Sequence, residues 1–202
     1  MMDHKRARSL VPALLALSMC WVARSAHAQG VQPPAPDLAD TIIARIGMVP
    51  ARHNTFHESR HIAALTHDLS SSGELIYARP GHVQKITHAP RPETLIVQGT
   101  TLSLARGQGP ARVVDLSHHA QLAALVEAIR APLDGDITAL RHDYTLAAQG
   151  DVAHWTLQLT PLPAMARYVR TITIDGQNNA MTVIRVVQAN GDTQVMRIDP
   201  ST

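Results

Sequence analysis

GELIYARPGHVQKITHAPRPETLIVQG, residues 73–99, is the stretch that decides the fold. Apolar and polar residues alternate within three of its segments, which is the period of a strand with one buried face. The segments are Leu75–Ala78, Val83–Thr87 and Thr94–Gln98. An Arg-Pro-Gly sequence separates the first two, and a pair of prolines separates the last two. We therefore expect three short strands joined by two turns.

Helical periodicity occurs before and after this stretch. Asp37 is placed to cap a helix over 37–48, in which the apolar residues Leu38, Ile42, Ile43 and Ile46 fall on one side. A second helix is expected over His118–Ala131, beginning after Ser117 and stopped by Pro132. Its apolar stripe is Leu122, Leu125, Val126 and Ile129. The segment Asp136–Leu140 predicts a third helical turn.

Strand patterns account for most of the remaining chain, and they contain no βαβ alternation. The segments are Asn54–Ile62, Leu102–Leu104, Arg112–Leu116, Val152–Leu159, Arg167–Asp175, Met181–Gln188 and Thr193–Ile198. Turns are expected at Ser70–Gly73, Asp175-Gly176 and Asn190-Gly191. The pattern predicts an α+β fold, an antiparallel sheet with about three helices on one face. A long curved sheet with few helices tends to enclose a cavity, whereas composition alone favours a packed core.

The first 28 residues have the features of an export signal. Three basic residues precede an apolar run, Leu10–Val22, and Ala26-His27-Ala28 supplies small residues for cleavage. The run of 13 residues is shorter than the roughly 20 needed to cross a bilayer. We expect a cleaved signal peptide (1–28), a flexible leader (29–36) and a single domain (37–202) in the periplasm.

Cleavage at this point changes the charge and the cysteine content. It removes Cys20, the only cysteine, so the mature 174 residues have no disulfide. A lipid anchor at Cys20 is the weaker alternative, because Met19 stands where a lipobox requires a small residue. Four of the 18 basic and one of the 16 acidic residues are also removed, which leaves a net charge of −1. No basic patch remains to favour nucleic acid as a partner.

One segment matches a zinc motif. His57-Glu58-Ser59-Arg60-His61 satisfies H-E-x-x-H, which on a helix holds zinc and places the glutamate to activate water. On a strand the two histidines lie about 13 Å apart, too far for one metal. Since the surrounding residues alternate as in a strand, we interpret the match as chance and expect no metal or cofactor. A small secreted zinc hydrolase remains the alternative function.

The stretch 73–99 resembles the family of periplasmic lipoprotein carriers called LolA. The family pattern is a Gly, an acidic residue and Leu, then Arg-Pro, a later proline and a final Gly. The matching residues here are Gly73-Glu74-Leu75, Arg79-Pro80, Pro90 and Gly99, followed by Thr101-Leu102. Phe56 in the first strand also matches, and the order of helices and strands is compatible from Asp37 to Ile198.

The resemblance implies an open half-barrel covered by three helices, enclosing a hydrophobic cavity for acyl chains. It implies a non-enzymatic, monomeric carrier of an acylated lipoprotein or another lipid amphiphile, with an inner-membrane transporter as donor and an outer-membrane acceptor. Arg79 matches the arginine that gates the helical cover. From the resemblance and the alternation, the residues expected in the cavity are Phe56, Leu75, Tyr77, Leu95, Val97, Leu102, Leu104, Trp155 and Leu157.

The sequence also departs from the family. Aromatic residues make up only 3% of the chain. The positions where the family carries aromatics are Ile76, Lys85, Ser103 and Ala105. These differences suggest another amphiphile as cargo, and an envelope sensor or structural protein on the same half-barrel is a further alternative.

Overall fold

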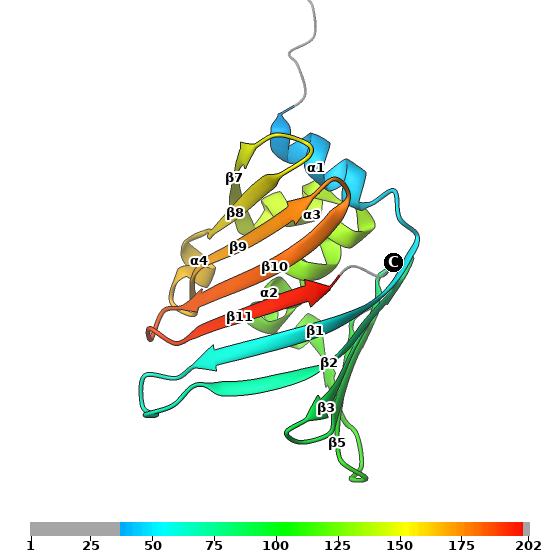
Figure 1. Cartoon of the computed structure of the whole chain (residues 1–202), viewed down its shortest axis with the longest axis vertical. Coiled ribbons are helices and arrows are strands. Elements are labelled where there is room, and N and C mark those ends of the chain that lie inside the picture. Colours follow the sequence, from blue (N-terminus) through cyan, green and yellow to red (C-terminus); the bar gives the residue numbers. More distant parts are fainter. Residues whose placement is uncertain (1–36, 200–202) are drawn as a thin grey trace, which may run out of the picture. The chain divides into compact units, whose positions relative to one another are not determined.

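The computed structural model describes residues 37–199, and the predicted signal peptide and leader lie outside the described residues. Eleven strands in this part form one antiparallel sheet (Figure 1). They are β1 (Ala51–His61), β2 (Leu69–Ala78), β3 (His82–Ala89), β4 (Glu93–Gln98), β5 (Thr101–Arg106), β6 (Arg112–Asp115), β7 (Tyr144–Gly150), β8 (Trp155–Pro161), β9 (Val169–Gln177), β10 (Ala180–Gln188) and β11 (Thr193–Asp199). The helices are α1 (Leu38–Ile46), the 3-10 turn η1 (Leu116–His118), α2 (Ala120–Asp134), α3 (Ile137–Asp143) and α4 (Pro163–Ala166).

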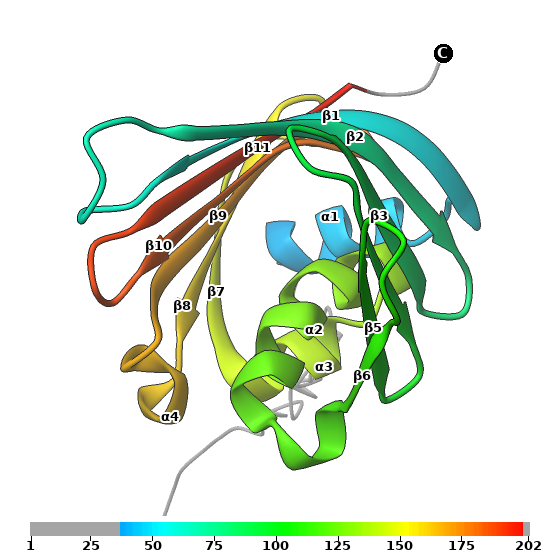
Figure 2. The same cartoon turned by 90° about the horizontal axis from the view of Figure 1, so that it is seen from below.

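The order of the strands joins two series of hairpins. Sequential neighbours pair from β1 to β6 and from β7 to β11, and the two series meet where β1 pairs with β11. In that pair Phe56 lies opposite Ile198. The sheet stays open between β6 and β7 and curves around α1, α2 and α3 (Figure 2). The predicted α+β class, an open antiparallel half-barrel covered by helices, is confirmed.

The stretch 73–99 forms most of β2, all of β3 and β4 and the turns between them. Gly81 and Gly99 have φ of 59° and 57°, a left-handed conformation that glycine adopts without strain. At Gly73 the reason for glycine is space, because an added Cβ would lie 1.9 Å from the carbonyl oxygen of Ile86 in β3. Two glycines are thus needed for turns, and the third for close approach of β2 and β3.

Two of the predicted turns are wrong. Ser70–Gly73 belongs to β2, where it pairs with β1 and so satisfies its backbone groups. Asp175-Gly176 lies inside β9, because Trp155 packs on Gly176 and leaves no room for a side chain there. The following turn is made instead by Asn178-Asn179, with φ of 51° at Asn178. The predicted turn at Asn190-Gly191 is confirmed, with φ of 93° at Gly191.

The helices agree with the sequence in position and differ at their ends. Asp37 caps α1 as predicted, accepting a hydrogen bond from the amide of Ala39. The second helix begins later than predicted, because Asp115 caps the short turn η1 before α2 starts at Ala120. It also continues through Pro132 to Asp134, and Gly135 ends it with φ of 75°. The predicted third helical turn is α3, capped by Asp136.

Strand boundaries also differ from the prediction, as at the starts of β8 and β9. The segment expected to begin at Val152 begins at Trp155 as β8, because residues 152–154 belong to the bend that follows β7. The segment expected to begin at Arg167 is preceded by α4, which the sequence pattern did not predict. Its four residues begin at Pro163, a position where the fixed φ of proline suits a first helical turn.

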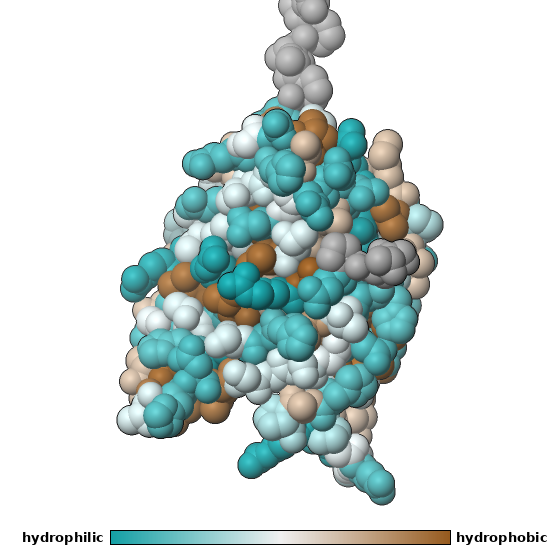
Figure 3. All heavy atoms as spheres, viewed as in Figure 1, coloured by the Kyte–Doolittle hydropathy of each residue, from teal (hydrophilic) through white to brown (hydrophobic). Residues whose placement is uncertain are grey.

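The buried apolar residues form two clusters on the inner side of the sheet. The larger cluster joins α1, α3 and the inner sides of β7 to β11, with Ile42, Leu157 and Ile174 at 0% exposure. The smaller cluster is Val97, Leu102 and Leu116, at the β4–β6 end. The outer face of the sheet carries polar side chains interspersed with apolar ones (Figure 3). None of the helices within 37–199 has the length and apolarity to span a membrane.

Candidate functional site

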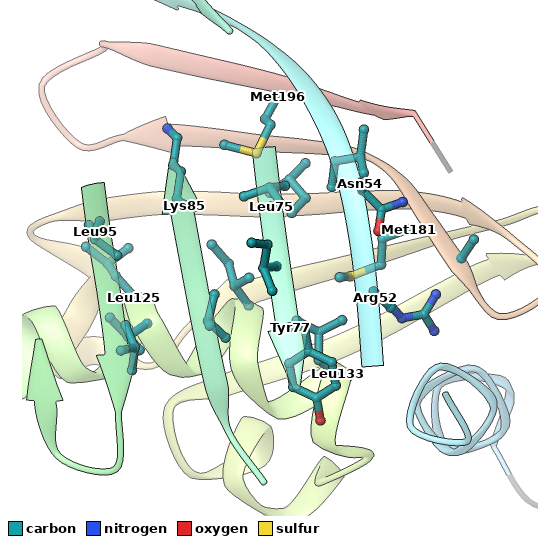
Figure 4. Close-up of a pocket in the computed structure, with 18 of the residues that line it drawn as sticks. Arg52, Asn54, Leu75, Tyr77, Lys85, Leu95, Leu125, Leu133, Met181 and Met196 are labelled. Atoms are coloured by element: carbon teal, nitrogen blue, oxygen red, sulfur yellow. The ribbon is translucent and has the colours of Figure 1, made fainter. Parts of the chain in front are cut away.

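A cavity of about 540 Å³ lies between the sheet and α2. This volume is within the range of ligand pockets, roughly 300–1,000 Å³. Aliphatic and thioether side chains from the strands and from α2 provide most of its wall (Figure 4). They include Leu75, Val83, Leu95, Val97, Leu125, Val126, Ile129, Leu133, Met181, Ile184, Met196 and Ile198. The space beneath the sheet is therefore an apolar compartment.

Helix α2 has one side of small buried residues and another side of larger residues that line the cavity. Its small residues Ala124, Ala128 and Ala131 are buried, which lets the helix lie close to its neighbours. Its larger residues Leu125 and Ile129 are only half-buried and line the cavity. Burial of large aliphatic groups normally stabilises a helix against the core. Here the large residues lie on the side that faces the cavity.

Charged and polar residues interrupt the apolar wall in two places. Lys85 lies near Met196, whereas Arg52 lies beside α1 (Figure 4). Arg60, Glu93 and Gln194 also contribute to the lining. The cavity therefore combines an apolar middle with two polar regions.

Arg52 ties together three parts of the chain at the α1 side. Its Nη2 donates to the carbonyl of Ile46 at the end of α1 at 2.9 Å and to the carbonyl of Asn179 at 2.6 Å. Its Nε is buried and has no hydrogen-bond partner among residues 37–199. Burial lowers the pKa of this guanidinium from its ordinary value, and Tyr77 partly opposes that change. Arg52 closes the cavity beside α1 by bridging β1, α1 and the β9–β10 turn.

Asp134, the last residue of α2, fixes that helix to the sheet. Its Oδ1 accepts from the hydroxyl of Tyr77 at 2.6 Å and from the amide of Gly81 at 3.0 Å. Burial and the bond to Asp134 raise the pKa of Tyr77, and nearby Arg79 opposes the increase. We call this arrangement of Tyr77, Gly81 and Asp134 the α2 latch.

A second attachment lies one turn earlier in α2. Arg130 donates from Nη1 to the carbonyl of Gly99 at 2.8 Å and from Nη2 to Glu127 at 2.6 Å. The glycine turns at 81 and 99 thus both contact the C-terminal half of α2. The stretch that decides the fold also holds the helix over the cavity.

Four of the residues that the sequence placed in the cavity do line it. They are Leu75 and Tyr77 of β2 and Leu95 and Val97 of β4, the two strands on either side of β3. Their inward direction follows from the register, in which Leu75 and Leu95 both lie opposite Lys85 of β3. The alternation in 73–99 was therefore sufficient to orient these strands.

The other apolar candidates lie outside the lining. Phe56 and Leu157 are fully buried, and Trp155 is 3% exposed, all within the larger cluster. Leu102 is buried in the smaller cluster, and Leu104 is half-buried without lining the cavity. Packing fills the space beside β8, so its inward residues are core.

Arg79 follows β2 and is exposed. Its backbone amide donates to the carbonyl of Pro50 at 2.9 Å. The side chain lies close enough to Tyr77 to oppose the rise in its pKa. Arg79 is thus a neighbour of the α2 latch on the solvent side and not part of the cavity wall.

The H-E-x-x-H segment lies in strand β1, as its alternation predicts. His57 and His61 are exposed, whereas Glu58 is buried at 5% exposure. His61 instead pairs with Asp68 at 2.9 Å and lowers its pKa. Within residues 37–199 no group of three or more potential ligands is placed to hold a metal ion. The geometry of a zinc hydrolase is therefore not formed by this segment.

Sequence reasoning missed the contribution of α2 and of the last two strands to the cavity. The apolar stripe that contains Leu125 and Ile129 was predicted correctly as one face of a helix. Its spacing does not indicate whether that face meets a packed core or a cavity. Met181 and Met196 lie in predicted strands, but which way they face depends on the pairing of β1 with β11. That pairing joins the two ends of the domain and cannot be deduced from local alternation.

A model of one protein family matches residues 31–199, and its description is "Outer membrane lipoprotein carrier protein LolA-like". No curated protein matches the chain. A crystal structure of a LolA superfamily protein from Nitrosomonas europaea aligns with a TM-score of 0.41 and 10% identity, covering 82% of this chain and 92% of that one. A DUF1329 family protein from Desulfovibrio piger aligns with a TM-score of 0.36, 13% identity and coverage of 81% and 92%. LprF from Mycobacterium bovis aligns with a TM-score of 0.32 and 12% identity, covering 81% of this chain and 94% of that one.

Proposed function

We propose the function of this chain from one premise, which is that the chain belongs to the LolA-like family of outer membrane lipoprotein carrier proteins. It acts as a carrier in the periplasm, without enzymatic chemistry. It binds the acyl chains of a lipoprotein or a related amphiphile in the cavity and moves them from the inner to the outer membrane. The observation that supports this most directly is the aliphatic side of α2, which faces a cavity of about 540 Å³.

The energetics of an apolar cavity suit a reversible carrier. Each buried methylene contributes about 0.8 kcal/mol, so ten of them contribute about 8 kcal/mol. Association itself costs about 4–15 kcal/mol in lost freedom. The chain of an amphiphile is thus held at moderate affinity, which allows both capture and release.

Release is proposed to involve the cover formed by α2. The α2 latch attaches the helix to β2 and to the β2–β3 turn, and Arg79 lies beside it. Arg79, the residue that matches the family's gate, acts by competing for the latch when the cover moves. Arg79→Leu should change the rate of release of a bound probe and leave the unfolding transition unaltered. Loss of the fold in this variant would indicate a structural role instead.

The direct test is to identify what the protein holds. The mature protein is taken from its native envelope under mild conditions, and bound lipids are identified by mass spectrometry. In parallel, binding of the neutral fluorescent probe Nile red is measured on delipidated protein. We expect a bound amphiphile and a blue-shifted probe. A protein that carries no lipid and also excludes Nile red is not a carrier.

A matched pair of variants ties binding to the cavity. Ile129→Trp places a larger side chain on the cavity side of α2 and should reduce Nile red binding. Val113→Trp changes an exposed residue of β6 and should have no effect. Equal binding by both variants would locate the probe elsewhere on the surface.

A further inference from the structure

The inner face of the sheet holds a carboxylate that is almost fully enclosed. Among residues 37–199, Glu58 is the one charged or polar residue that is buried, with 5% exposure. Its two oxygens accept hydrogen bonds from Lys85 of β3 and, at 2.9 Å, from Arg60 two positions along β1. Burial of a charge is unfavourable unless it is paired. Glu58 therefore holds two cationic side chains in place.

These two cations lie between Glu58 and the cavity. Lys85 and Arg60 both line the cavity, whereas Glu58 does not. The Lys85 ammonium also lies 4.8 Å from the centre of the Phe56 ring, a distance typical of cation–π contact. The buried carboxylate and the ring thus fix the position of an ammonium group at the cavity wall.

The charges in this region do not cancel. Two cations share one carboxylate at Glu58, which leaves an excess of one positive charge. The neighbouring pair of Glu93 and Arg106, at 2.8 Å, is neutral. An ammonium has three donors and a guanidinium has five. Each of the two cations makes one side-chain hydrogen bond within the described residues, so both retain donors for a ligand.

The apolar wall begins immediately beside these donors. Lys85 lies opposite Leu75 in β2 and opposite Leu95 in β4, and both leucines line the cavity. A ligand with its polar end at Lys85 can therefore place an alkyl chain directly on the leucines. The arrangement pairs one region that favours a negative charge with one that favours a chain.

We propose that Lys85 and Arg60, held by Glu58, bind the anionic head group of the amphiphile whose chain fills the cavity. The head group is a carboxylate or a phosphate, because both accept hydrogen bonds from ammonium and guanidinium groups. This inference rests on the proposed function and adds the chemical class of the cargo. A cationic head group meets an excess of positive charge, and an uncharged one leaves that charge uncompensated.

The test compares probes that share one chain and differ in head group. Laurate, dodecyl phosphate, dodecanol and dodecyltrimethylammonium are titrated against the mature protein with Nile red bound. Inorganic phosphate is included to separate a lipid head group from a free anion. We expect the two anionic amphiphiles to displace Nile red at concentrations about 10- to 100-fold lower than the cationic one. Inorganic phosphate should displace no Nile red.

Variants at the two partners should act in opposite directions. Lys85→Met removes the excess charge and should abolish most of the preference for anionic probes. Glu58→Gln removes the negative charge while its amide oxygen can still accept a hydrogen bond, so the excess of positive charge rises by one and the preference should become several-fold stronger. The matched control is Arg185→Met, which removes a cation from an exposed position in β10. If the cluster has only a structural role, the Lys85 and Glu58 variants lower the free energy of unfolding and leave the order in which the four probes displace Nile red unchanged.

Each outcome decides between the two levels of inference. Absence of Nile red binding in the wild type overturns the proposed function itself. Nile red binding with equal displacement by all four head groups keeps the carrier function and overturns the anionic site. Displacement of Nile red by inorganic phosphate also overturns the anionic head-group site, because it would show an anion site that does not depend on an attached alkyl chain.

Discussion

Replacing Tyr77 with phenylalanine should lower the free energy of unfolding by about 1.5 kcal/mol. The hydroxyl donates to the Asp134 carboxylate at 2.6 Å, and hydrogen bonds to charged groups contribute about 1.5–3 kcal/mol. The lower value is expected because the Gly81 amide remains bonded to the same oxygen at 3.0 Å. The carboxylate is thus not left without a partner.

Asp134→Ala tests the other side of the same contact. It removes both hydrogen bonds, which together contribute about 3 kcal/mol. Asp134 is also the last residue of α2, where a negative charge opposes the helix dipole by up to about 1 kcal/mol. The net loss should be about 2 kcal/mol. The double variant should resemble Asp134→Ala, which gives a coupling energy of about 1.5 kcal/mol between the two residues.

Urea unfolding followed by the fluorescence of Trp155 measures these differences. With a slope of about 2 kcal/mol per molar urea, the Tyr77→Phe midpoint should fall by about 0.7 M. Tyr168→Phe is the matched control, because Tyr168 is exposed and contacts Arg167 only through its ring. Additive effects of the two single substitutions, or a Tyr77→Phe midpoint equal to that of the control, would refute the latch.

Three further outcomes are expected. Gly73→Ala should lower the free energy of unfolding in urea by about 1–3 kcal/mol or more, because the new Cβ meets the Ile86 carbonyl. Gly99→Ala adds its Cβ in open space and should lower it by only about 1–2 kcal/mol, from the left-handed backbone conformation. Burial, followed by the charge of Asp143, raises the pKa of Tyr144 to about 12. An unfolded tyrosine ionises near pH 10, so the folded state retains the proton between pH 10 and about 12, and its stability falls there by up to about 1.4 kcal/mol per pH unit. Tyr144→Phe should show a shallower alkaline loss; an unchanged pH profile would contradict the assignment. Ile129→Trp should weaken Nile red binding. Overpacking by the larger side chain should lower the free energy of unfolding, measured in urea, by no more than about 1–3 kcal/mol.

The sequence predicted those elements whose signals are local. Asp37 followed by isoleucines at helical spacing gave α1, because the cap and the buried stripe lie in one segment. The alternation around Lys85 gave β3 and its neighbours, because short turns leave adjacent strands only one way to pair. For the same reason Leu75, Tyr77, Leu95 and Val97 could be oriented before the structure was known.

The predictions failed where distant segments decide the outcome. Trp155 and Leu157 alternate as clearly as Leu75 and Tyr77, yet α1 and α3 cover their end of the sheet and make them core. Gly176 looked like a turn glycine, but its actual role is to accommodate the Trp155 ring. Alternation identifies the two faces of a strand and carries no information on whether the inner face meets a helix or a cavity.

The stretch 73–99 both contributes to the cavity wall, through Leu75 and Leu95, and holds α2 over the cavity. Entry or exit that displaces α2 must break the hydrogen bonds of Asp134 to Tyr77 and Gly81 and that of Arg130 to Gly99. Three hydrogen bonds with charged partners correspond to about 4.5–9 kcal/mol. Since a buried methylene contributes about 0.8 kcal/mol, about six to eleven methylenes are needed to offset that opening. We therefore expect the cover to discriminate against short chains, and the strength of these two attachments to set the shortest chain that the cavity accepts.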